Sequence, residues 1–114
     1  MIDQPPAQIH CVATAIYGEA RGESETGKRA VAHVIYNRAK HRKLTPCQVI
    51  RQKGQFTFKV KKSYKGPTWD SVYRIATNPG IDPTAGAYYF HNKRVKPGWH
   101  LRRTATIGGH LFFQ

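Results

Sequence analysis

The segment Ile16-Tyr17-Gly18-Glu19-Ala20-Arg21-Gly22-Glu23 ends a predicted apolar helix with an acidic side chain. Apolar residues at 9, 12, 13, 16 and 17 repeat at the spacing of one helical face, so a helix is predicted over 5–20, with Gly22 as its stop. Burial beside apolar groups and the negative end of the helix dipole both disfavour a carboxylate anion. Glu19 is therefore predicted to be a proton donor near neutral pH.

Three further helices are predicted after this segment. The second begins near Ser24 or Thr26, where a hydroxyl can cap free backbone N–H groups. A short third helix follows Thr45-Pro46, and a fourth carries Trp69 and ends at Asn78-Pro79-Gly80.

The last third of the chain has a different composition. Residues 87–91 and 105–113 are aromatic and β-branched, which is typical of strands, and we expect one strand in each range. Helices followed by a small antiparallel sheet predict an α+β fold. We expect residues 1–114 to form a single domain and to be monomeric.

The charge is strongly one-sided. The chain has nineteen Lys and Arg but six Asp and Glu, so its formal net charge is +13. This charge implies attraction to polyanions. A nucleic-acid-binding module is the alternative that this charge raises, but no recognition motif or basic stripe along one element is present, so no specific nucleic-acid partner is expected. No apolar run is long enough to span a membrane, and no secretory signal pattern begins the chain.

Cys11 and Cys47 are the only cysteines. Their spacing and that of the six His match no metal-ligand motif, so neither a metal nor another cofactor is expected. The two cysteines are either buried thiols or one disulfide formed in an oxidising compartment.

Taken in order, several motifs resemble the catalytic domain of the SleB-type cell-wall hydrolases, known from spore-cortex-lytic enzymes and some phage lysins. The similarity runs from about Ile9 to Phe113. The matching pieces are Tyr17-Gly18-Glu19-Ala20-Arg21-Gly22-Glu23, Gly27, Ala30-Val31-Ala32-His33-Val34, Asn37-Arg38, Cys47, Gly54-Gln55-Phe56, Asp82-Pro83-Thr84-Ala85-Gly86-Ala87, Tyr89, His91, Trp99, Thr106-Ile107-Gly108-Gly109-His110 and Phe112.

The resemblance implies a lysozyme- or lytic-transglycosylase-like architecture, with residues 1–114 as a single catalytic domain without a separate wall-binding module. It also implies cleavage of peptidoglycan glycan strands at the MurNAc-β-1,4-GlcNAc bond. It gives Glu19 the role of catalytic acid and favours a disulfide between Cys11 and Cys47. A cationic chain of this family without a visible signal is read as a phage or prophage endolysin. It would be made in the cytoplasm, be released by a holin, and act at the wall or in the periplasm, held there by anionic envelope polymers or lipopolysaccharide.

The substrate groove is expected to use aromatic and neutral polar side chains. Gln55 and Phe56 suit a loop that offers one of each. Tyr89 and His91 share one face of the first C-terminal strand. On the strand predicted over 105–113, Thr106 and His110 have the same parity, unless Gly108-Gly109 introduces a bulge.

Few carboxylates are available to assist Glu19. Glu23 lies beyond Gly22, so its direction is uncertain, and the other acidic residues fall in predicted caps and turns. This shortage favours a one-carboxylate lytic transglycosylase that leaves 1,6-anhydro-muramyl ends. A hydrolytic muramidase, which usually needs two carboxylates, and a zinc-dependent amidase on the same substrate are the alternatives.

Overall fold

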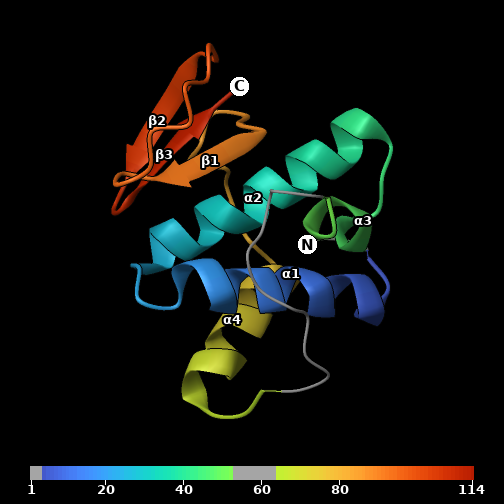
Figure 1. The fold of residues 1–114 in the computed structure, drawn as a ribbon. Helices are drawn as coiled ribbons and strands as arrows, with labels where there is room; N and C mark the ends of the chain where they lie inside the picture. The colour runs from blue at the N-terminus through green and yellow to red at the C-terminus, as the bar shows by residue number, and fades with distance from the viewer. Residues whose placement is uncertain (1–3, 53–63) are drawn as a thin grey trace.

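A computed structural model describes residues 4–52 and 64–114. Four helices precede three strands, which confirms the α+β prediction (Figure 1). The elements are α1 (Pro6–Ala20), α2 (Glu25–Arg42), α3 (Pro46–Ile50), α4 (Pro67–Thr77), β1 (Tyr89–Asn92), β2 (Arg103–Ile107) and β3 (His110–Phe113).

The helices begin where local chemistry supplies a start signal. Ser24 caps α2 by accepting a hydrogen bond from the backbone N–H of Gly27 at 3.2 Å. Thr45 and Gln48 form a reciprocal capping box at the start of α3. Proline occupies the first turn of α1, α3 and α4, where its missing N–H leaves no helical hydrogen bond unmade. The predicted starts of α2 and α3 are confirmed.

Helix α1 is the centre of the helical part, because it packs against α2, α3 and α4. Its residues Val12 and Ile16 are fully buried, and they share one core with Val31 and Ile35 of α2 and Val72 of α4. The apolar spacing that predicted α1 is therefore the spacing of its buried face. This packing fixes the end of α1, where Glu19 lies.

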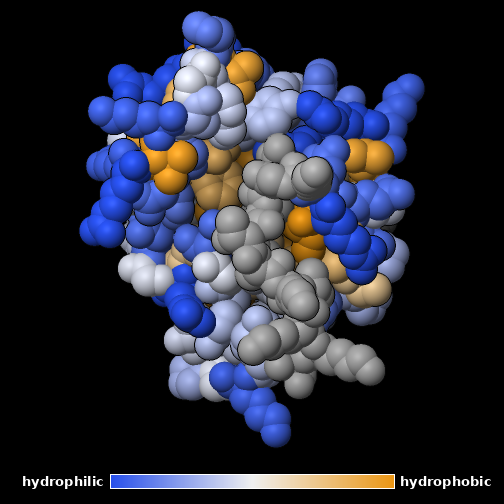
Figure 2. Space-filling model, in the orientation of Figure 1, coloured by the Kyte–Doolittle hydropathy of each residue, from blue (hydrophilic) through white to orange (hydrophobic). Residues whose placement is uncertain are grey.

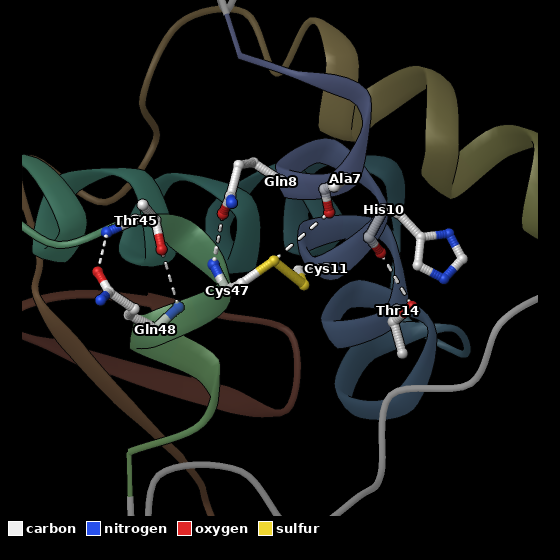
Figure 3. The surroundings of a disulfide bond; sticks show 8 residues. All are labelled: Ala7, Gln8, His10, Cys11, Thr14, Thr45, Cys47 and Gln48. Carbon is white, nitrogen blue, oxygen red and sulfur yellow. Dashed lines mark hydrogen bonds between the residues drawn. A yellow bond between two sulfur atoms is a disulfide. The ribbon is translucent and has the colours of Figure 1, made fainter.

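A disulfide joins α1 to α3, the pairing of Cys11 with Cys47 that the resemblance implies (Figure 3). Their Cα atoms are 5.3 Å apart, and 36 positions separate them in the sequence. The backbone N–H of Cys47 also donates to Oε1 of Gln8 at 2.9 Å. Together these bonds hold the short helix α3 against the first turns of α1.

Reducing this disulfide should lower the free energy of unfolding by about 2–4 kcal/mol, because the cross-link restricts the unfolded chain over a long loop. Urea unfolding with and without a reductant measures the change. The Cys11→Ser/Cys47→Ser double variant is the control, and it should match the reduced protein and ignore the reductant. Equal unfolding midpoints for the oxidised and reduced protein would contradict this stabilising effect.

The strands form one antiparallel sheet in the order β1-β3-β2. Phe90 and Phe112 turn toward α2 and pack with its Ala30 and Val34. As a result α2 lies between α1 and the sheet (Figure 1). The sheet thus rests on the helical part through a second, smaller core.

The single strand predicted over 105–113 is wrong, because Gly108-Gly109 forms a tight turn between β2 and β3 rather than a bulge within one strand. Gly108 has φ +55°, a conformation that glycine adopts without strain. Thr106 pairs with Leu111, whereas Ile107 pairs with His110. Paired residues share a face, so Thr106 and His110 lie on opposite faces of the sheet.

Within residues 4–52 and 64–114, no helix is long and apolar enough to cross a membrane.

Candidate active site

Glu19 lies in the last turn of α1, as the sequence predicts, and its side chain is partly buried. The residues one turn back on the same helix, Ala15 and Ile16, are completely buried. The carboxyl group therefore stands at the boundary between the helical core and the surface. A proton donor needs such a place, because it must reach substrate while apolar neighbours limit its hydration.

Glu23 lies in the turn after α1 and binds the β2–β3 turn. Its Oε1 accepts a hydrogen bond from the backbone N–H of Gly109 at 2.9 Å, across 86 positions of sequence. The side chain of Glu23 is 24% exposed. This contact brings the tip of the hairpin to the turn that follows Glu19, as the arrangement in Figure 1 shows.

Glycines make this close approach possible. A Cβ on Gly108 would lie 2.2 Å from Oε1 of Glu23, and one on Gly27 would lie 3.0 Å from the Cβ of Glu23. Neither distance is an ordinary van der Waals contact. The two glycines therefore leave room for the Glu23 side chain on both sides.

His110 is the first residue of β3, directly after the β2–β3 turn. It is 4% exposed, and its Nδ1 is 4.0 Å from Oε1 of Glu23. Burial lowers the pKa of His110, although Glu23 opposes the shift. Its ring meets Phe90 edge-on at 5.2 Å between centroids. These contacts place His110 where it supports the hairpin, on the face of the sheet that packs against α2.

The other predicted groove residues lie elsewhere. Tyr89 and His91 lie on the face of the sheet opposite to Phe112, where they form a ring cluster with Trp99 and Phe113 at centroid distances of 5.0–5.9 Å. The guanidinium of Arg38 from α2 also lies 4.6 Å over the ring of Tyr89. Thr106 is exposed on β2. Gln55 and Phe56 lie outside the described residues. Of the predicted groove residues that the structure describes, His110 is the one shown to approach the turn next to Glu19, through its contact with Glu23.

An aromatic cluster beside the end of α1 is missing from the sequence prediction. The ring of Tyr17 is 4.3 Å from that of Tyr64 and 6.0 Å from that of Trp69, and the guanidinium of Arg21 lies 5.0 Å above Tyr17. Tyr17 precedes Glu19 by two positions. Tyr64 falls in a basic segment with no periodicity, so no sequence pattern predicts this contact. Flat rings at this place can support a sugar ring.

The remaining described carboxylates have other partners or positions. Glu25 pairs with Arg29 at 3.4 Å and with Arg74 at 3.6 Å. Asp82 accepts hydrogen bonds from Asn37, Gly86 and twice from Thr84. Burial opposes its ionisation, but these hydrogen bonds lower the pKa of Asp82. Asp70 is exposed in the first turn of α4.

Across the described ranges, no group of three His, Cys, Asp or Glu side chains is placed to hold a metal ion.

The profile of a family described as Cell Wall Hydrolase matches residues 22–113. The chain belongs to the cell wall hydrolase family. Glu19 lies just before the first matched residue. The spore cortex-lytic enzyme of Halalkalibacterium halodurans is 38% identical over 112 residues, a span of 91% of this chain and 34% of that protein. The spore cortex-lytic enzyme of Oceanobacillus iheyensis is 35% identical over 115 residues, or 91% of this chain and 40% of that protein.

Two solved structures agree with this membership of the cell wall hydrolases. The catalytic domain of Bacillus cereus SleB has a TM-score of 0.81 and 30% identity, over 100% of this chain and 95% of that one. The catalytic domain of the germination-specific lytic transglycosylase SleB from Bacillus anthracis has a TM-score of 0.83 and 30% identity, over 100% and 99%. The SleB-type resemblance and the lysozyme-like fold are therefore confirmed. The chain spans less than half the length of the curated relatives.

Proposed function

We propose that this chain cleaves peptidoglycan glycan strands at the MurNAc-β-1,4-GlcNAc bond, with Glu19 as the proton donor. The observation that carries the proposal is the position of Glu19, partly buried at the end of α1 and next to the turn that Glu23 ties to the β2–β3 hairpin. The similarity to SleB catalytic domains, one of them described as a lytic transglycosylase, supports the same activity.

The proposed reaction uses one carboxyl group twice. Glu19 first gives its proton to the bridging oxygen while the bond from this oxygen to C1 of the muramyl sugar breaks, and the GlcNAc hydroxyl leaves. The C6 hydroxyl of the same muramyl sugar then bonds to C1, and its proton returns to Glu19. The product is a 1,6-anhydro-muramyl end, and no water is consumed.

The contacts made by the other carboxylates favour this transglycosylase route over hydrolysis. A hydrolytic muramidase usually needs a second acidic group. Glu23 is the carboxylate nearest to Glu19 in sequence, but its Oε1 accepts the hydrogen bond from Gly109. Glu25 and Asp82 are held by ion pairs and hydrogen bonds respectively. Among the described carboxylates, Glu19 is the one that ends α1 at the boundary of the helical core.

We also propose that the chain works outside the cytoplasm as a phage or prophage endolysin, released by a holin. The Cys11–Cys47 disulfide supports an oxidising setting. The net charge of +13 would hold the chain near anionic envelope polymers or lipopolysaccharide. The face drawn in Figure 2 is largely hydrophilic, with hydrophobic residues in separate patches, as expected for a monomer that acts on a polar polymer.

Digestion of purified sacculi, followed by separation and mass spectrometry of the soluble fragments, tests the bond that is cut. We expect disaccharide-peptides with intact amide links to the stem peptides, in the same yield with and without a chelator. Release of free stem peptides, or loss of activity with the chelator, would instead support a zinc-dependent amidase and overturn the proposal.

A further inference from the structure

We infer that a second binding site, for a sugar that carries an anionic group, lies at the C-terminal end of α2, apart from Glu19. This α2-end pocket is a cavity of about 410 Å³, within the size range of small-molecule sites. It is lined by Asn37, Lys40, His41, Gly86, Tyr88 and Gln114. Glu19 lies near the other end of α2, because α1 ends where α2 begins.

One wall of the pocket is aromatic and firmly held. The rings of His41 and Tyr88 stack at 4.4 Å between centroids with 19° between their planes. The backbone of Tyr88 is fixed on both sides, since its carbonyl accepts from Nε of Arg38 at 2.8 Å and its N–H donates to the carbonyl of Phe113 at 2.8 Å. Such a ring pair offers a flat surface to the C–H face of a sugar without needing to be ordered on binding.

The amide side chains of the pocket are also oriented in advance. Nδ2 of Asn37 donates to Asp82 at 2.9 Å and to the carbonyl of Ala87 at 3.1 Å, so the amide is fixed with its Oδ1 as the remaining acceptor. Nε2 of Gln114 donates to the carbonyl of Gly86 at 3.1 Å. Fixed amide groups of this kind recognise sugar hydroxyls.

The charge around the pocket is positive. Lys40 lines it. Arg38, which is 2% exposed, reaches the pocket wall only through its hydrogen bond to the carbonyl of Tyr88, and its guanidinium lies 4.6 Å over the ring of Tyr89 with Nη1 lacking a hydrogen-bond partner. Burial lowers the pKa of Arg38 to about 10, so it is still a cation at neutral pH. The one carboxylate tied to the lining, Asp82, already accepts four hydrogen bonds.

Cations in the last turn of a helix also stabilise its dipole, and Lys40 fills that role too. Dipole stabilisation, however, needs neither a stacked ring pair nor oriented amides around a cavity. Together these features match a sugar ring with a carboxylate or a phosphate. A carboxylate would come from muramic acid and a phosphate from a phosphodiester polymer of the envelope. Only this choice of source rests on the proposed function.

Titration of the ¹⁵N-labelled chain with N-acetylmuramic acid, N-acetylglucosamine 1-phosphate and neutral N-acetylglucosamine tests the site by amide chemical shifts. We expect saturable shifts at Gly86, Tyr88 and Gln114 with at least one anionic sugar, and an affinity about fivefold or more above that of the neutral sugar. The tighter of the two anionic sugars identifies the source. Equal affinity for all three, or shifts elsewhere only, would overturn the inference.

Two variants that each remove one positive charge test whether Lys40 binds the anionic group of the sugar. Lys40→Gln should weaken binding of the preferred anionic sugar about fivefold, whereas Lys65→Gln removes the same charge from the exposed start of α4 and should leave binding unchanged. Equal weakening by both would show attraction to net charge alone and contradict the site. Glu19→Gln should bind as the wild type does, even if peptidoglycan is not the substrate, so failure of this inference and failure of the proposed function are separable.

Discussion

Replacing Glu19 by Gln is expected to lower the rate of peptidoglycan cleavage by about 100- to 10,000-fold. The amide has nearly the shape of the protonated carboxyl group but no acidic proton to deliver, and it cannot accept the proton of the C6 hydroxyl. The initial rate of turbidity loss in a suspension of purified sacculi measures the effect. Thermal unfolding should be close to that of the wild type, because the substitution keeps the volume of a partly buried side chain.

Glu25→Gln is the matched control. It makes the same chemical change on an exposed carboxylate whose ion pairs with Arg29 and Arg74 lie on the surface. Such pairs contribute about 1 kcal/mol or less to stability, so the rate should stay within about twofold of the wild type. If Glu19→Gln retained the wild-type rate, or if both variants lost activity equally, Glu19 would not be the catalytic acid.

Gly108→Ala should destabilise the protein by about 2–4 kcal/mol. The new Cβ would lie 2.2 Å from Oε1 of Glu23, and φ at this position is +55°. The carboxylate of Glu23, at the end of its side chain, must then move away and give up the hydrogen bond that it accepts from Gly109. Because this contact sets the hairpin beside the end of α1, the rate on sacculi should fall as well. Urea unfolding gives the change in free energy.

The Gly98→Ala variant is the control for Gly108→Ala. It measures the cost of a left-handed backbone without a steric clash. Gly98 has φ +70°, but a Cβ there would meet no atom within 4 Å. Its cost should therefore be only that of the left-handed backbone, about 1–2 kcal/mol. Equal destabilisation by the two substitutions would mean that the approach of Glu23 to the hairpin contributes nothing.

The helices follow from local signals, whereas the hairpin does not. The apolar spacing before Glu19 predicts α1, and the capping hydroxyls of Ser24 and Thr45 predict where α2 and α3 begin. Each of these signals lies within a few neighbouring residues. Strands β2 and β3 are only five and four residues long, so alternation across Gly108-Gly109 resembles one continuous strand. Alternation continued through the turn predicts Thr106 and His110 on one face, whereas they lie on opposite faces.

The candidate site shows the same division. The position of Glu19 at a helix end is readable from the sequence, because the helix and its stop are local. The contact between Glu23 and Gly109 spans 86 positions, and the ring contact between Tyr17 and Tyr64 depends on how α1 packs against the chain before α4. Such contacts depend on tertiary packing, and no periodic pattern in the sequence predicts them. Tyr89 and His91 share a face as predicted, but it is opposite to the face on which Phe112 packs against α2. Tyr89 contacts α2 only through Arg38 and Arg42.

Digestion of sacculi in water enriched in heavy oxygen tests most directly whether Glu19 works without a second carboxylate. If the C6 hydroxyl is the nucleophile, the new muramyl ends are 1,6-anhydro sugars and carry no heavy oxygen. If an activated water attacks instead, the ends are reducing sugars that hold one heavy oxygen at C1. We expect the first product, whereas reducing ends labelled from the solvent would show that an activated water, and not the C6 hydroxyl, is the nucleophile.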